Sequence, residues 1–205
     1  MSESAREAAG NPPIPGPTSQ KPAAARAYTS VLAWLLFLVP AMLGLGGDLW
    51  LKNWSFPDGV PVDPALMPYA GRHPGVDLLG HIQEPAPVIP HVLGFTTTVN
   101  RGAVFGIGQG KVDWFLGFSL LALGFIVWMF VSSKADQRVV HLALGLITAG
   151  ALGNLYDRAV FHGVRDMLKF YVNWFPYIFN VADALLDIGV PLLIARWLLV
   201  KEEQK

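Results

Sequence analysis

The sequence predicts an all-α membrane protein with four transmembrane helices and a small extracytoplasmic β-rich region between the first and second helices. Composition and segment length carry this prediction. The 205-residue chain is 53% hydrophobic and only 15% charged, whereas soluble domains are nearer a quarter charged. Its apolar residues gather in long segments with few or no charges, each close to the length that a bilayer core requires.

The N-terminal region divides into a tail and the first expected helix. Residues 1–28 are polar, small and proline-rich, so they cannot bury enough apolar surface to fold, and we expect a disordered cytoplasmic tail. The uncharged stretch 27–47 follows, with its most apolar part at 31–45. A cleaved signal peptide is the alternative, because glycines lie near the end of this stretch. The apolar run is longer than a signal-peptide core, which favours a retained helix.

Three further helices are expected downstream. The segments 114–132 and 139–156 are free of charge, and aromatic residues near their ends are typical of interfacial anchors. The segment 181–200 is long enough to cross a membrane, but it carries Asp183, Asp187 and Arg196. Hydropathy alone would therefore score it poorly.

Positive charge predicts the orientation of the helices. One side of the membrane would hold Arg26, Lys134, Arg138, Lys201 and Lys205. Because Lys and Arg concentrate in cytoplasmic loops, both termini are expected in the cytoplasm. Residues 29–205 would then form one four-helix domain, with an extended Pro-rich extracytoplasmic loop at about 53–99.

The extended loop holds the β-rich region and three histidines. Its end, 92–105, contains a β-branched TTTV run that predicts short strands lying against the membrane. His73, His81 and His91 could be considered as metal ligands, but their spacing fits no usual ligand pattern, so no metal site is expected. The chain has no cysteine, which excludes disulfides and thiolate chemistry. Its formal net charge of zero provides no basic field for nucleic acid.

Polar residues gather at the outer ends of the expected helices. Ionisable residues are costly there unless they face a polar interior. Three clusters contain Asn154, Asp157 and Arg158, then Asp166, then Asn180 and Asp183. Taken singly, such residues are commonly helix caps, with Asn180 as N-cap and Asp183 in the first turn. Because the clusters meet at one depth on one side, we interpret them together as a functional site.

A pair of close carboxylates suggests a chemistry. Two such groups cannot both ionise cheaply, so the pair keeps one proton. One carboxylate can then act as a base toward water while the other acts as an acid, as peptide hydrolysis requires where no serine, cysteine or metal serves. Asp183 lies in a first helical turn, where the macrodipole favours its charged form. We therefore hypothesise that Asp166 more often carries the proton.

Four motifs attach to the expected helices in a fixed order. They read GDLWLK at 47–52, NRGAVF at 100–105, GALGNLYDR at 150–158 followed by GVRD at 163–166, and FNVAD at 179–183. Together they resemble the motifs of the lipoprotein signal peptidases (signal peptidase II), the bacterial membrane aspartyl peptidases. A single motif would be uninformative, but the ordered set covers roughly residues 30–200.

The resemblance implies an aspartic endopeptidase of the bacterial cytoplasmic (inner) membrane with its active site at the outer face. Such enzymes remove signal peptides from diacylglyceryl-modified prolipoproteins, cutting before the lipid-modified cysteine. Asp166 and Asp183 would be the catalytic pair, without a cofactor or metal. Prolipoproteins and membrane lipids would be the partners of a monomeric chain. The substrate-binding or supporting positions would be Asn100, Asn154, Asp157, Arg158, Asn180, Asp48 and Lys52.

The chain also departs from the family pattern. Ala184 and Gly106 stand where serines are usual, Asp187 stands where a small or apolar residue is usual, and the 53–99 loop is longer. Two other functions are alternatives: a non-catalytic lipoprotein-binding protein or chaperone, and a proton-coupled transporter using span four. The retained carboxylate pair argues against the binder, and the scarcity of polar residues within 114–132 argues against the transporter.

Overall fold

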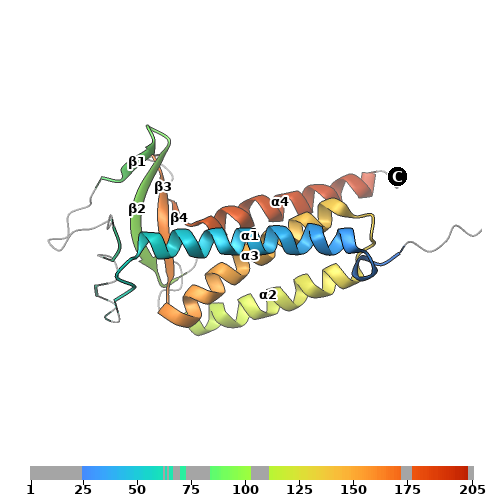
Figure 1. The fold of residues 1–205 in the computed structure, drawn as a ribbon, viewed down its shortest axis with the longest axis horizontal. Coiled ribbons are helices and arrows are strands. Elements are labelled where there is room, and N and C mark those ends of the chain that lie inside the picture. Colours follow the sequence, from blue (N-terminus) through green and yellow to red (C-terminus); the bar gives the residue numbers. More distant parts are fainter. Residues whose placement is uncertain are drawn as a thin grey trace, which may run out of the picture.

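Four long helices lie side by side, and a small antiparallel sheet closes one end of them (Figure 1). The structure is a computed structural model and describes residues 25–61, 63, 65–66, 70–72, 84–102, 111–171 and 177–202. Most of the predicted N-terminal tail, His73, His81, Gly106 and the end of the NRGAVF motif lie outside the described residues.

Each predicted segment holds a helix, although α1 begins four residues after the start of the predicted stretch 27–47 and ends eight residues beyond it. Their bounds are α1 Val31–Ser55, α2 Val112–Ser132, α3 Arg138–Phe161 and α4 Val181–Glu202. Within the described part of the chain, α1, α2 and α3 are long and apolar enough to cross a membrane. The more highly charged α4 is not among them, so a fourth crossing stays a prediction. Because α1 and α3 continue toward the sheet, Lys52 and Arg158 lie in helical turns rather than in loops.

The third helix is the centre of the bundle. It packs against both α1 and α4, with α2 alongside. Small residues permit this close approach, because a Cβ on Gly145 would collide with the Phe37 carbonyl of α1. A Cβ on Gly150 would likewise collide with the Ala182 carbonyl of α4. On the α2 side, the rings of Phe37 and Phe130 stack with centroids 4.7 Å apart.

The sheet joins two parts of the chain that are distant in sequence. Its strands are β1 Ala86–Ile89, β2 Leu93–Asn100, β3 Val164–Phe170 and β4 Ile178–Phe179, in the order β1-β2-β3-β4. The predicted strand within 92–105 is present as β2. The prediction that the β-rich region lies only between the first two helices is incomplete, because β3 and β4 follow α3. Pairing with β3 satisfies backbone groups that β2 would otherwise leave exposed.

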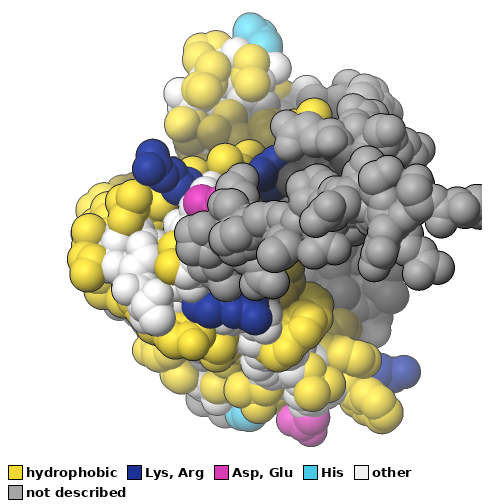
Figure 2. Space-filling model, turned by 90° about the vertical axis from the view of Figure 1, so that its right-hand side faces the viewer, with side chains coloured by type: hydrophobic (Ala, Val, Ile, Leu, Met, Phe, Trp, Pro, Cys, Tyr) yellow, Lys and Arg dark blue, Asp and Glu magenta, His cyan; other side chains and the backbone are white. Residues whose placement is uncertain are grey.

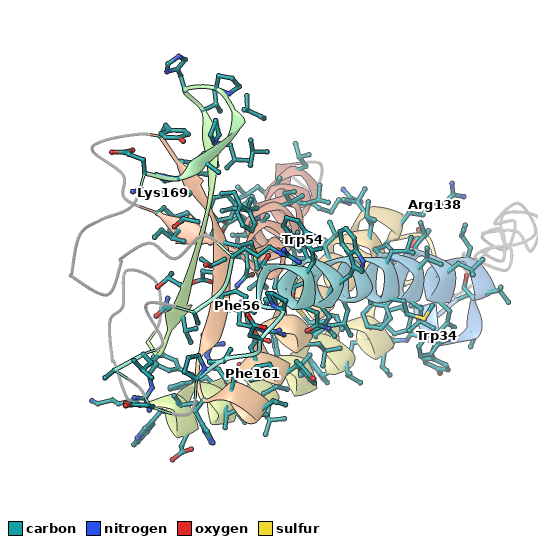
Figure 3. The ribbon with its side chains drawn as sticks, turned by 60° about the vertical axis from the view of Figure 1, so that its left-hand side comes forward. Trp34, Trp54, Phe56, Arg138, Phe161 and Lys169 are labelled. Carbon is teal, nitrogen blue, oxygen red and sulfur yellow. The ribbon has the colours of Figure 1, made fainter. Side chains whose placement is uncertain are left out.

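At the opposite end of the bundle, the residues before α1 are held by the α2–α3 connection. The backbone N–H of Ala27 donates to Ser133, and the Arg26 guanidinium donates to the Ser132 carbonyl at 2.7 Å. Residues Ala27–Thr29 form a 3-10 helix, so the last part of the segment 1–28 is structured. Figure 3 shows Trp34 and Arg138 at this end and Trp54 and Phe161 at the sheet end.

Candidate active site

A cavity at the sheet end brings together most of the predicted site residues. It has a volume of about 340 Å³ and lies between α2, α3, α4 and the sheet. Among the predicted residues, those that line it are Asn100, Asn154, Arg158, Asp166 and Asp183. Much of the remaining wall is apolar and includes Phe115 and Phe118 of α2. A few convergent polar groups within an apolar wall are typical of a ligand pocket.

Asp166 reaches the cavity from β3 and is only 2% exposed. Its backbone pairs with Thr98 of β2, which fixes its position in the sheet. Its Oδ1 accepts a 2.7 Å hydrogen bond from the Asn180 side-chain amide. Burial raises the pKa of Asp166 well above its ordinary value, and the nearby Asp183 carboxylate raises it further, against hydrogen bonds from Asn180 and Asn100. This direction fits the hypothesis that Asp166 carries the shared proton.

Asn180 and Asp183 cap the start of α4 reciprocally. The Asp183 backbone N–H donates to Asn180 Oδ1 at 2.9 Å, and the Asn180 backbone N–H donates to Asp183 Oδ2 at 3.3 Å. This is the arrangement of a capping box, with an amide and a carboxylate as the two side chains. The cap and the site are therefore the same residues. With Oδ1 turned toward the helix, Asn180 Nδ2 donates to Asp166 and also to Asn154 Oδ1, the latter at 3.1 Å.

Asn154 connects Asp183 to a buried lysine. Its Nδ2 donates to Asp183 Oδ1 at 2.7 Å, and its Oδ1 accepts from Lys52 Nζ at 3.3 Å. An ammonium group can only donate, so Lys52 determines which way the Asn154 amide points. Asp166 and Asp183 are thus linked through the side-chain amides of Asn180 and Asn154. The ammonium group of Lys52 orients the Asn154 amide in this link.

A buried charge cluster lies behind Asn154, consisting of Asp48, Lys52, Asp157 and Arg165. Lys52 Nζ is 2.7 Å from Asp48 Oδ2 and 3.3 Å from Asp157 Oδ2. Asp48 Oδ1 also accepts the Ala182 backbone N–H at 2.8 Å, satisfying an amide in the first turn of α4. The predicted supporting residues Asp48, Lys52 and Asp157 therefore lie outside the cavity lining. They hold Asn154 and the start of α4 in place.

Arg165 belongs to this cluster and was missed by the sequence analysis. It is 1% exposed, and its Nη2 and Nε donate to Asp157 Oδ1 at 2.8 and 3.2 Å. Its Nη1 donates to Asn53 of α1 at 2.9 Å, so one guanidinium ties β3 to two helices. The only sequence signal was its place beside Asp166 in the GVRD motif.

Tyr177 is a second residue that the sequence did not single out. It lines the cavity, and its ring stacks on Phe179 with centroids 5.2 Å apart. Burial and the nearby aspartates, Asp183 foremost, raise the pKa of Tyr177. The phenol therefore stays protonated and keeps its hydrogen-bond donor. No motif surrounds it in the sequence, so only its position in space reveals it.

Two other residues that the sequence singled out do not line the cavity. Asp187, one turn beyond Asp183 on α4, is exposed and is not among the residues that line the cavity. His91 lies in the turn between β1 and β2, where it is also exposed. Within the described ranges, no group of three or more His, Asp or Glu side chains is placed to hold a metal ion.

Fold and site together define a helical membrane protein with a carboxylate pair at one mouth of its bundle. Residues 73–199 match the family described as signal peptidase (SPase) II. A lipoprotein signal peptidase of Latilactobacillus sakei subsp. sakei is 32% identical over 169 residues, which is 82% of this chain and 97% of that protein. The chain belongs to the signal peptidase II family, and its family membership implies a peptidase.

Other relatives agree with this assignment. A lipoprotein signal peptidase of Desulfitobacterium hafniense is 36% identical over 124 residues, covering 60% of this chain and 81% of that protein. A solved structure described as a bacterial membrane enzyme at 2.3 Å resolution superposes with a TM-score of 0.63 and 28% identity. The match covers 82% of this chain and 90% of that chain. The likeness therefore extends over most of both chains.

Proposed function

We propose that this chain is an aspartic endopeptidase that removes signal peptides from diacylglyceryl-modified prolipoproteins, cutting just before the lipid-modified cysteine. Family membership supports signal-peptide removal from prolipoproteins. The observation that carries the chemistry is the placement of Asp166 and Asp183 in one cavity, linked through Asn180 and Asn154.

The proposed reaction uses one proton held by the pair. Ionised Asp183 takes a proton from a water whose oxygen attacks the scissile carbonyl carbon, and Asp166 gives its proton to the carbonyl oxygen. The tetrahedral diol then collapses. Asp183 passes its proton to the leaving nitrogen as the C–N bond breaks, and Asp166 takes a proton from a diol hydroxyl. The pair ends with one proton, as it began.

Charge balance supports this protonation state. Among the described residues, those that pair or couple directly with the two carboxylates and the buried cluster are the cations Lys52, Arg158 and Arg165 and the carboxylates Asp48, Asp157, Asp166 and Asp183. The ionised cluster has one negative charge in excess, and a single proton on the catalytic pair neutralises it. A buried cluster of this kind is most stable when its charges are matched.

Three polar side chains of the cavity are proposed to bind the substrate peptide. Arg158 is half-buried, and its guanidinium lies 5.4 Å from the Phe115 ring centroid, which limits where it can point. It can donate to the developing oxyanion or to a peptide carbonyl. Asn100 and Tyr177 supply further polar groups along the same wall. The apolar side chains that α2 contributes to the cavity wall would contact the hydrophobic part of the signal peptide.

The proposed placement in the membrane follows from side-chain exposure and charge. Exposed apolar residues on α4, such as Ile188 at 58% and Trp197 at 64%, would face lipid if α4 is a fourth crossing. Arg26, Lys134 and Arg138 lie at the end of the bundle opposite the cavity. The positive-inside rule then places both termini in the cytoplasm and the cavity at the outer face of the bacterial inner membrane.

Expression in bacterial cells that lack their own lipoprotein signal peptidase tests the proposal. The intact chain should restore cleavage of a lipid-modified precursor, while Asp166→Asn and Asp183→Asn should each abolish cleavage and still reach the membrane. Asp113→Asn is a matched control, because Asp113 is an exposed carboxylate at the same end of the bundle but outside the cavity lining. Normal processing by either active-site variant would refute the assigned roles. Precursor binding without cleavage by the intact chain would favour the non-catalytic binder.

A further inference from the structure

The turn of the β1–β2 hairpin presents an uncharged apolar surface with no cover from the described residues. Residues 87–92, the hairpin tip, read PVIPHV and are all exposed. Val88, Ile89 and Val92 are 52%, 50% and 51% exposed. Figure 2 shows the hairpin standing clear of the bundle, with mostly hydrophobic side chains and a histidine. Exposed apolar groups gathered in this way usually mark an interaction surface.

The base of the hairpin is braced against β3. The Tyr171 backbone N–H donates to the Val92 carbonyl at 3.0 Å, and its hydroxyl donates to the Pro85 carbonyl at 2.5 Å. A Cβ on Gly94 would lie 2.6 Å from Pro85 and 3.0 Å from the Tyr171 ring, so only glycine permits this packing. The tip is therefore held out by a fixed strand pair rather than by a loose loop.

Trp54 indicates the depth at which the hairpin lies. It is 46% exposed near the sheet end of α1, one turn beyond Trp50, which is 69% exposed. Exposed tryptophans at the ends of spanning helices mark the level of the lipid headgroups. The Trp54 ring meets Phe95 of β2 at 5.5 Å, so β2 lies at this level. The strands run across the helix axes, and the hairpin therefore extends sideways from the bundle (Figure 1).

Basic side chains lie beside the same surface. The Arg72 guanidinium lies 4.8 Å from the Trp54 ring centroid, and its Nε donates to the Trp54 carbonyl at 2.7 Å. Lys169 of β3 pairs with Gly94 at the hairpin base, and Figure 3 shows its side chain directed away from the helices. Cations at headgroup level next to an apolar tip complement the phosphates and the upper acyl chains of a bilayer.

We propose that the hairpin tip, residues 87–92, inserts into the interfacial region of the leaflet at the sheet end of the bundle. Val88, Ile89 and Val92 enter the boundary between headgroups and acyl chains, with Arg72 at the phosphates. The contact fixes the depth of β2 and, through strand pairing, of β3 with Asp166 relative to the lipid headgroups. It requires no catalysis and stands apart from the proposed function.

Site-specific fluorescence tests the insertion directly, because the chain contains no cysteine. Ile89→Cys and Val92→Cys, each labelled with an environment-sensitive dye in phospholipid nanodiscs, should emit at shorter wavelength than labelled Glu84→Cys. Glu84 is the control, since it is exposed just before β1. Lipids with a spin label near the headgroup should quench the two tip probes several-fold more than the control, and aqueous iodide should quench them less.

Equal emission and equal iodide quenching at all three positions would overturn the proposal. A tip that is water-exposed in lipid nanodiscs but shielded in native membranes would also overturn it, in favour of a protein partner. Adding Ile89→Asp should return the Val92 probe to a water-like emission. The midpoint of thermal unfolding in detergent should stay unchanged, because the Ile89 side chain lies outside the packed core.

Discussion

The side-chain amide of Asn180 donates a 2.7 Å hydrogen bond to Oδ1 of Asp166. The Oδ1 atom of the same asparagine accepts the Asp183 backbone N–H at the start of α4. One side chain therefore couples the first turn of a helix to a carboxylate on a strand. The proposed catalytic pair keeps its geometry only while this coupling is intact.

Asn180→Ala should lower activity far more than it lowers stability. Loss of the cap and of the bond to Asp166 should cost about 1–3 kcal/mol of unfolding free energy. Displacement of Asp166 should reduce kcat/KM on the order of 100-fold. Thermal unfolding in detergent and cleavage of a lipid-modified peptide measure the two effects. An active Asn180→Ala enzyme would show that the amide link is dispensable.

Asp166→Asn should make the folded protein more stable at neutral pH. Burial raises the pKa of Asp166 in the folded state, so the folded protein binds the proton more tightly than the unfolded chain. That stabilisation is complete below about pH 3.9 and is lost as pH rises through the raised pKa. The asparagine variant avoids this loss. Unfolding midpoints measured from acidic to neutral pH should therefore diverge with increasing pH, and parallel curves would contradict the raised pKa.

Lys52→Met should strongly destabilise the protein, because it leaves Asp48 and Asp157 buried without their shared cation. The expected loss is about 3–5 kcal/mol. Adding Asp48→Asn should recover part of it, since the new side-chain oxygen can still accept the Ala182 backbone N–H. A double-mutant cycle of Lys52→Met and Asp48→Asn, measured by unfolding, should give an interaction energy of about 0.5–3 kcal/mol between the two residues.

The control for this cycle is Lys111→Met, because Lys111 is an exposed lysine just before α2. Its effect on unfolding should stay within about 0.5 kcal/mol. Additive effects of Lys52→Met and Asp48→Asn would mean that the two residues do not stabilise each other.

Gly153→Ala should push α3 away from α1 and α4. A Cβ at this position would collide with the Asp48 carboxylate and lie 3.1 Å from the Ala182 side chain. Overpacking of this kind costs about 1–3 kcal/mol, and activity should fall because Ala182 lies next to Asp183. Gly124→Ala on α2 is the matched control, since nothing lies within 4 Å of the added carbon. The control should unfold as the parent does, and equal effects of both substitutions would contradict the close packing.

Sequence reasoning named five residues that line the cavity, but it did not predict how they are arranged. The motif residues Asn100, Asn154, Arg158, Asp166 and Asp183 were predicted, and all of them line the cavity. The sequence did not predict that Asp48, Lys52 and Asp157 would form a buried charge cluster separate from these cavity residues. Spacing along a helix does not show which of its faces is covered by other segments. Arg165 and Tyr177 were missed for the same reason, since their roles depend on contacts with distant segments.

In the sheet, too, one strand could be predicted from the sequence but its pairing partner could not. The TTTV run indicated β2, but its partner β3 lies more than sixty residues later in the chain. Strand propensity is local, whereas strand pairing depends on which segments the helices bring together. The short β4 had no distinct signal in the sequence. The charges of Asp183, Asp187 and Arg196 lower the hydropathy of α4, so a helix could be predicted there more firmly than a membrane crossing.

The sequence by itself determined the helical membrane character, the positions of α1, α2 and α3, and the family. Long uncharged segments must satisfy their backbone groups internally in lipid, and the helix is the local way to do so. Only the tertiary structure placed Asp166 on a strand and Asp183 on a helix, with Asn180 and Asn154 between them. That arrangement depends on side-chain hydrogen bonds between segments far apart in the chain, and no local pattern encodes their geometry.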